Sequence, residues 1–247
     1  EKVAENEAGG ITQHVGAYQI EHNSSKITFI DTPGHAAFTE MRARGSKLTD
    51  IVVLVVAADD GVKPQTIESI KHAKAAKVPI VVAINKCDLP EADPQKIKNQ
   101  LLEHELIAEE LSGDTLMVEI STKTKQNLTK LVESIILQSE LLDLKADFNV
   151  KANAVVLESK VDIGRGPIAN IIITNGTLKK GDYFVSGLKW GKVRAIINDL
   201  GQNIHEAYPA SPVEVLGING ASKSGDDFVV LENEKEAKSL CDARIQE

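Results

Sequence analysis

The feature that most constrains the fold is a short apolar run that ends in a polar turn. Residues 27–30 are Ile-Thr-Phe-Ile, and residues 31–35 are Asp-Thr-Pro-Gly-His. A second run, at residues 80–84, is followed by Asn-Lys-Cys-Asp at residues 85–88. Each run predicts a buried strand, and ligands of open α/β sheets bind at the carboxyl ends of such strands. The two turns therefore predict an α/β sheet with a ligand site along one edge.

Strand and helix patterns alternate from residue 27 to about residue 139. Apolar runs without polar alternation predict strands covered on both faces, at residues 51–57, 80–84 and 116–120. Apolar residues at helical spacing predict helices at residues 64–77, 94–110 and 128–139. Asp93-Pro94 predicts an N-cap followed by proline in the first turn. This order predicts a doubly wound, mainly parallel sheet, and residues 16–20 paired with 26–30 are expected to add an antiparallel edge strand.

The pattern changes after residue 142. Short strands separated by glycine-containing turns are predicted at residues 154–161, 168–175, 183–186, 192–198 and 213–218. With no helical period among them, these strands predict a small antiparallel β-barrel. We therefore expect three segments: a nucleotide-binding domain at residues 1–145, a barrel at 146–232, and the start of a helical connection at 233–247.

Composition excludes several classes of protein. Two cysteines, Cys87 and Cys241, argue against a disulfide framework. No apolar stretch approaches the length that spans a bilayer, so we expect no membrane partner. The net charge of −8 disfavours non-specific nucleic-acid binding as the main role. Residues 151–200 differ, because they hold eight basic and four acidic side chains.

Asn85-Lys86-Cys87-Asp88 matches the Asn-Lys-x-Asp signature with which GTPases read guanine. Asp88 can accept hydrogen bonds from guanine N1–H and from the exocyclic amine, and adenine cannot supply both. Asn85 can bond the purine edge, and the Lys86 stem can lie along the base. A solvated loop uses the same residue types, but the pairing with Asp-x-x-Gly at residues 31–34 favours a nucleotide site. Cys87 is interpreted as a small packing residue.

Two further segments fit this interpretation. Residues 121–123, Ser-Thr-Lys, follow the next predicted strand, where a second base-contacting loop would lie. Residues 9–14, Gly-Gly-Ile-Thr-Gln-His, would form a switch loop in which the Thr12 hydroxyl suits Mg²⁺. His35 can orient an attacking water, because phosphoryl transfer depends mainly on positioning and electrostatics.

These segments resemble bacterial-type translation initiation factor two, a translational GTPase. The resemblance is carried by residues 7–18, 31–38 and 41–45, by residues 52–74, and by Gly-Arg-Gly at 164–166 in the barrel. It implies a GTP-binding domain followed by the second-domain barrel, with GTP or GDP and Mg²⁺ as cofactors. By motif, Thr12 and Asp31 would bind Mg²⁺, Gly34 the γ-phosphate, and His35 would be catalytic. The residues that would serve the guanine base are Asn85, Lys86, Asp88, Ser121, Thr122 and Lys123.

The resemblance also implies partners. We expect the ribosome, through the small subunit and the GTPase-activating region of the large subunit, with ribosomal RNA contacted by the barrel. Initiator tRNA would bind C-terminal domains outside these residues. The expected location is the cytoplasm, with a mitochondrial or other organellar matrix as the alternative.

One departure leaves alternatives open. No Gly-x-x-x-x-Gly-Lys-Ser/Thr phosphate loop occurs in the 247 residues, so we expect a central fragment that keeps the base-reading loops and lacks most of the phosphate cradle. GTP hydrolysis is then expected of the intact factor. One alternative is a ribosome-binding fragment without hydrolysis. Another is an elongation-type or selenocysteine-type GTPase, but those usually carry Asp-Cys-Pro-Gly-His.

Overall fold

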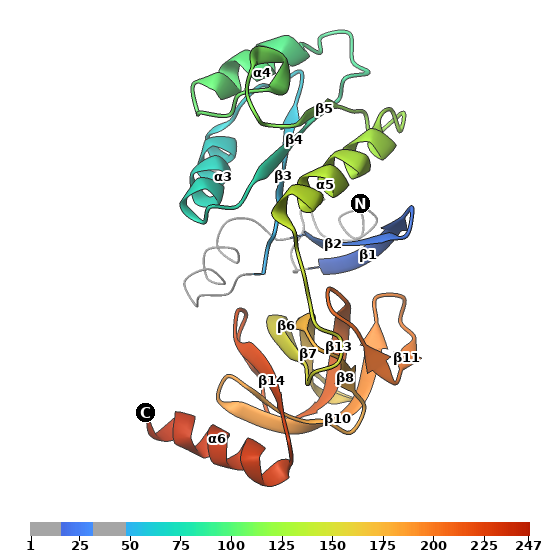
Figure 1. The fold of residues 1–247 in the computed structure, drawn as a ribbon, viewed down its shortest axis with the longest axis vertical. Coiled ribbons are helices and arrows are strands. Elements are labelled where there is room, and N and C mark those ends of the chain that lie inside the picture. The colour runs from blue at the N-terminus through green and yellow to red at the C-terminus, as the bar shows by residue number, and fades with distance from the viewer. Residues whose placement is uncertain (1–15, 32–47) are drawn as a thin grey trace. The chain divides into compact units, whose positions relative to one another are not determined.

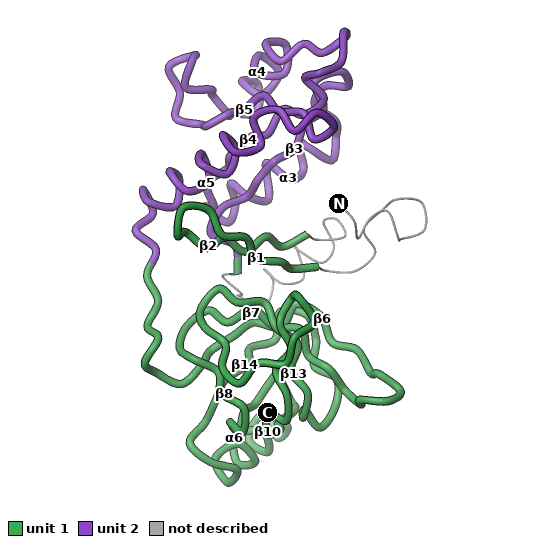
Figure 2. Tube along the Cα trace, turned by 90° about the vertical axis from the view of Figure 1, so that its right-hand side faces the viewer, with its two compact units in different colours: residues 1–48, 145–247 green, residues 49–144 purple. Residues whose placement is uncertain are grey.

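A computed structural model describes residues 16–31 and 48–247 (Figure 1). Contacts divide the chain into two compact units, residues 49–144 and residues 1–48 with 145–247 (Figure 2). Each unit is described by itself. Among the helices that the structure describes, none combines the length and apolar character that crossing a bilayer requires.

The unit of residues 49–144 is built on a parallel sheet in the order β3-β4-β5. Its strands are β3 (Val52–Ala57), β4 (Ile80–Asn85) and β5 (Met117–Glu119). Val81, Val82, Ala83 and Ile84 of β4 are fully buried, as expected for a strand covered on both faces. This confirms the predicted parallel α/β sheet.

Helices cover both faces of this sheet (Figure 1). α3 (Pro64–Ala75) and α4 (Pro94–Leu102) place Ile70, Ile97 and Leu101 in one core with β3 and β4. On the other face, α5 (Leu128–Leu142) packs Leu128 and Leu131 against Ala83 and Val118. Asp93 accepts a hydrogen bond from the Lys96 N–H at 3.1 Å, which confirms the predicted cap.

α4 is shorter than its pattern predicts. It ends at Leu102, and the Leu106 N–H turns back to the Leu101 carbonyl at 3.1 Å while Glu105 adopts a φ of 62°. This turn buries Leu106 in the core beside α4, so the helix ends early. The short 3₁₀ helix η2 (Glu109–Leu111) follows.

The predicted antiparallel hairpin is present. β1 (Gly16–His22) and β2 (Ser25–Asp31) pair antiparallel with each other and form a separate two-stranded sheet. Ala17 of β1 and Ile30 of β2 pack instead against Leu157 and Ile172 of the barrel. The structure therefore confirms the antiparallel pairing of the hairpin, and its addition to the parallel sheet stays a prediction.

The strands between residues 153 and 231 form the predicted antiparallel barrel. Its strands are β6 (Asn153–Asp162), β7 (Gly166–Asn175), β8 (Leu178–Lys179), β9 (Tyr183–Ser186), β10 (Lys189–Asn198), β11 (Asn203–Ile204), β12 (Glu206–Ala207), β13 (Pro212–Ile218) and β14 (Asp227–Leu231). The antiparallel order β10-β13-β7-β6-β14-β9 closes through β9 and β10. Phe184 and Phe228 stack inside it at 4.2 Å between ring centroids. The prediction missed β14, which lies between β6 and β9, and the two-residue strands β8, β11 and β12.

Two segments outside the barrel strands contact the barrel. α6 (Glu234–Gln246) packs Ala237 and Cys241 onto Val185, and Arg244 pairs with both carboxylate oxygens of Asp227 at 2.7 and 2.9 Å. The segment that precedes β6 also bonds to the barrel, because the Gly176 N–H donates to the Asp147 carbonyl at 2.7 Å.

Candidate functional site

The candidate site lies where β4 and β5 end. Parallel pairing sets Ile84 opposite Glu119, so the chain leaves both strands at the same edge of the sheet. The first loop, residues 85–88, begins at the last residue of β4, and the second loop, residues 121–127, follows β5. This is the edge at which the sequence predicted a ligand site.

Backbone hydrogen bonds join the two loops at their bases. The Ile120 N–H donates to the Ile84 carbonyl at 2.7 Å, and the Cys87 N–H donates to the Ile120 carbonyl at 3.1 Å. Lys86 adopts a φ of 62°, which folds the first loop back over the end of β5. The main chain therefore fixes Asp88 relative to Ser121.

The Ser121 hydroxyl connects the loops most directly. Ser121 is fully buried, and its Oγ donates to Asp88 Oδ1 at 2.8 Å while accepting from the Thr124 N–H at 3.1 Å. Asp88 itself is exposed. The carboxylate is therefore oriented from below by a buried donor and keeps acceptor capacity toward solvent.

Asn85 and Thr122 form a second connection. Asn85 Oδ1 accepts from the Thr122 N–H at 3.1 Å, and Asn85 Nδ2 donates to Thr122 Oγ1 at 3.4 Å. The structure thus joins four of the six residues predicted to read a base, Asn85, Asp88, Ser121 and Thr122, and the other two, Lys86 and Lys123, are exposed in the same loops. It also shows that the Thr122 N–H is engaged by Asn85.

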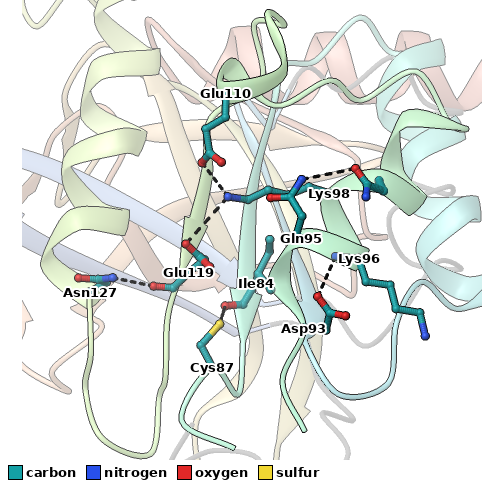
Figure 3. Close-up of polar contacts among 10 residues, drawn as sticks. Ile84, Cys87, Asp93, Gln95, Lys96, Lys98, Glu110, Glu119 and Asn127 are labelled. Atoms are coloured by element: carbon teal, nitrogen blue, oxygen red, sulfur yellow. Dashed lines mark hydrogen bonds and ion pairs between the residues drawn. The ribbon is translucent and has the colours of Figure 1, made fainter. Parts of the chain in front are cut away.

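Sequence reasoning missed two residues that shape the second loop. Asn127 Nδ2 donates to the Glu119 carbonyl at 2.8 Å (Figure 3), and the Ser121 N–H donates to the Gln126 carbonyl at 3.2 Å. Asn127 adopts a φ of 56° at the start of α5, a conformation that asparagine tolerates better than most residues. An asparagine directly before a predicted helix is therefore the sequence signal that could have identified Asn127.

Cys87 is a half-buried residue of the first loop. Its thiol donates to the Ile84 carbonyl at 3.2 Å (Figure 3), and its side chain packs against the core of β3 and β4. Burial raises the pKa of Cys87, and the nearby charge of Glu119 raises it further. A raised pKa disfavours the thiolate, which fits the interpretation of Cys87 as a packing residue.

The residues predicted to serve phosphate and metal lie elsewhere in the chain. Asp31 ends β2 and is exposed. Thr12, Gly34 and His35 lie outside the described residues. Within residues 16–31 and 48–247, no group of three or more His, Cys, Asp or Glu side chains is arranged to hold a metal ion.

Comparison with protein families matches both parts of the chain. The family described as "Elongation factor Tu GTP binding domain" matches residues 1–140, and "Elongation factor G domain 2" matches residues 151–231. The first match covers more than half of the chain.

Curated relatives extend the similarity over almost the whole chain. It is 78% identical over 245 residues to "Translation initiation factor IF-2" of Pelagibacter ubique, covering 99% of this chain and 33% of that protein. It is 60% identical over 242 residues to the IF-2 of Rhizobium etli, covering 98% of this chain and 26% of that protein. The chain therefore spans about a third or less of these relatives, and the predicted resemblance to initiation factor two is confirmed.

Solved structures agree on the fold. The crystal structure of GDP-bound aIF5B from Aeropyrum pernix matches with a TM-score of 0.78 and 27% identity, covering 99% of this chain and 52% of that chain. A bacterial selenocysteine-specific elongation factor, EF-Sec, matches with a TM-score of 0.70, covering 93% of this chain and 40% of that chain. Its 22% identity supports the shared fold alone.

Proposed function

Because this chain belongs to the elongation factor Tu GTP binding domain family, we propose that it reads the guanine base of GTP and GDP with the two loops at the ends of β4 and β5. The observation that carries this proposal is the hydrogen bond from buried Ser121 Oγ to Asp88 Oδ1 at 2.8 Å. It orients an exposed carboxylate before any ligand binds, so recognition requires little reorganisation.

Asp88 supplies the selectivity. Its free lone pairs accept from guanine N1–H and from the 2-amino group. Adenine has an acceptor at N1 and no 2-amino group, so it leaves the carboxylate unpaired at a cost of about 1–3 kcal/mol. The Lys86 side chain is exposed, and in this proposal its stem would cover one face of the base.

The second loop supplies a donor for guanine O6. The Thr122 N–H is occupied by Asn85 Oδ1. The Lys123 N–H, one residue further along, has no acceptor in the described part of the chain, and we assign it to O6. Asn85 Nδ2, held by Thr122 Oγ1 at 3.4 Å, faces the purine edge in this proposal.

The phosphate half of the site belongs to the segments at residues 9–14 and 31–35. Thr12 and Asp31 offer a hydroxyl and a carboxylate, the hard oxygen donors that suit Mg²⁺. Bound Mg²⁺ would neutralise phosphate charge. Gly34 would contact the γ-phosphate through its N–H, and His35 would orient the attacking water by accepting a hydrogen bond from it.

We extend the proposal to the intact factor. It would be a translation initiation GTPase that acts on the ribosome and promotes initiator tRNA placement and subunit joining. Residues 1–145 would form its GTP-binding domain, residues 146–232 its second domain, and residues 233–247 the start of a connection. We place it in the cytoplasm or an organellar matrix. The 78% identity to an IF-2 favours this over an elongation-type or selenocysteine-type factor.

The barrel is our candidate for contact with ribosomal RNA, and its basic residues differ in how free they are to bind phosphate. Arg165 lies 3.5 Å from Asp162 and 3.6 Å from Glu214, and Lys160 also pairs with Glu214 at 3.6 Å. No carboxylate pairs with Lys179 or Lys180 in the described part of the chain, so these two lysines are the better phosphate ligands.

Base selectivity tests the proposed site without requiring tight binding. Saturation-transfer NMR with the 247-residue chain should detect bound GDP at millimolar concentration. Added ADP should not displace the GDP. Equal competition by ADP would reject guanine reading. Turnover should be measured after joining the chain to a Gly-x-x-x-x-Gly-Lys-Ser/Thr segment. Absence of ribosome-stimulated hydrolysis in that protein would favour a ribosome-binding fragment without hydrolysis.

A further inference from the structure

A buried lysine lies behind the two loops. Lys98 of α4 is 3% exposed, and its Nζ lies 2.7 Å from Glu110 Oε1 and 3.9 Å from Glu119 Oε2 (Figure 3). Both carboxylates are partly open to solvent, with side chains 61% and 46% exposed. A buried ammonium is costly unless it is paired, so its position between two carboxylates calls for a reason.

Glu119 connects Lys98 to the second loop. It is the last residue of β5, and its carbonyl accepts from Asn127 Nδ2 at 2.8 Å (Figure 3). Its side chain faces Lys98 while its main chain closes the loop of residues 121–127. The orientation of Glu119 therefore sets the point at which this loop leaves the sheet.

The next two residues carry that orientation to the first loop. The Ile120 carbonyl accepts from the Cys87 N–H at 3.1 Å, and Ser121 Oγ donates to Asp88 Oδ1 at 2.8 Å. A continuous set of contacts thus runs from the Lys98 ammonium, through the end of β5, to the Asp88 carboxylate.

We propose that Lys98 is a positioning residue for base recognition: its buried ammonium holds Glu119 and so fixes the end of β5, from which Ser121 orients Asp88. This inference rests on the proposed function. It assigns a role to a residue outside the nucleotide-binding motifs, on a helix to which the proposed function gives no contact with the base. A purely structural Lys98 would instead tie α4 to η2 through Glu110 and leave the loops unaffected.

Cys87 provides a readout that needs no nucleotide. It lies inside the first loop, and the charges facing it are Glu119 and Asp88, which raise its pKa, and Lys98, which lowers it. In a Cys241→Ala background it is the only thiol of the chain. Its alkylation by iodoacetamide across a pH series gives an apparent pKa and a limiting rate constant of the thiolate.

The two quantities separate local charge from positioning. Lys98→Met should raise the apparent pKa of Cys87 because a cation is lost, and Glu119→Gln should lower it because an anion is lost. Both variants should nevertheless raise the limiting rate constant, by roughly threefold or more, because both release the loop that covers the thiol. The matched control is Lys96→Met on the same helix, whose exposed side chain points away from this network (Figure 3) and which should change neither quantity.

Nucleotide selection gives the second readout. IDP lacks the 2-amino group that Asp88 accepts from, so the ratio of the IDP to the GDP dissociation constant reports Asp88 placement. Lys98→Met and Glu119→Gln should lower this ratio about fivefold, with Lys96→Met unchanged. A wild-type chain that prefers neither GDP nor IDP would contradict the proposed function. The limiting alkylation rate constants of Cys87 would still test whether Lys98 positions the loops.

Folding is controlled by the choice of substitution. Methionine fills the volume of the Lys98 stem, and it leaves carboxylates that solvent already reaches, so the variant should fold. If the Lys98→Met chain does not fold, Glu119→Gln alone tests the proposal. This variant should fold because it removes only a half-exposed charge. Limiting Cys87 rates that stay at the wild-type value in the folded variants would overturn the proposal.

Discussion

Ser121 Oγ and Asp88 Oδ1 lie 2.8 Å apart, although the two residues are separated by 33 positions in the chain. The donor is fully buried and the acceptor is exposed, so the bond orients a surface carboxylate from inside the fold. The account of base recognition given above depends on this relationship.

Ser121→Ala should weaken GDP binding by about tenfold, because Asp88 loses a hydrogen bond worth about 1.4 kcal/mol in its oriented state. The Thr124 N–H also loses its acceptor, so the second loop should exchange its amide protons faster. Calorimetry and hydrogen exchange measure the two effects. The control is Ser134→Ala on α5, where the hydroxyl donates to the Lys130 carbonyl within the same helix. A Ser121→Ala chain that binds GDP as tightly as the unchanged chain would show that the bond to Asp88 does not matter.

The sequence predicted most of the strands, most of the helices and the edge of the sheet that carries the loops, because these depend on local patterns. Polar residues directly after apolar runs indicate strand ends, and Asn85 and Ser121 lie where that rule puts them. The end of α4 at Leu102 was not predictable from periodicity, because it depends on the burial of Leu106. Lys98 looks like any polar helix position until the fold brings Glu110 and Glu119 to it.

His35→Ala should reduce ribosome-stimulated GTP hydrolysis by roughly two orders of magnitude, since a water-orienting or proton-transfer group is lost. The measurement requires a protein that joins this chain to a phosphate loop. Guanine nucleotide affinity should stay nearly constant, because the imidazole contacts neither base nor metal in the proposal. Loss of nucleotide binding in this variant would contradict the role assigned to His35.

Lys180→Gln should lower the dependence of ribosome binding on salt, reducing the slope of log affinity against log salt by about 1. Arg165→Gln should change the slope less, because its guanidinium already faces Asp162 and Glu214. Binding of 30S subunits at a series of salt concentrations compares the two. Equal slopes for Lys180→Gln and the unchanged protein would exclude Lys180 from the contact.

Gly176→Ala should destabilise the barrel by about 2 kcal/mol or more, because strain at positive φ adds to a steric collision. Gly176 has a φ of 75°, and a β-carbon there would overlap the carbonyl oxygens of Val150 and Lys151. Gly166→Ala is the matched control, since Gly166 has a φ of 79° with nothing within 4 Å. Urea unfolding followed by Trp190 fluorescence compares them, and equal losses would show that the close approach to residues 150 and 151 is unimportant.

The most direct test of the central claim is the base preference of Asp88→Asn. An amide in place of the carboxylate donates where guanine also donates, and it suits the 2-carbonyl of xanthine. Competition binding should therefore show GDP affinity falling and XDP affinity rising, so that the preference reverses. Asp93→Asn makes the same chemical change at the N-cap of α4, where asparagine caps as well as aspartate, and should leave selectivity unchanged. An Asp88→Asn chain that still prefers GDP over XDP would contradict the account.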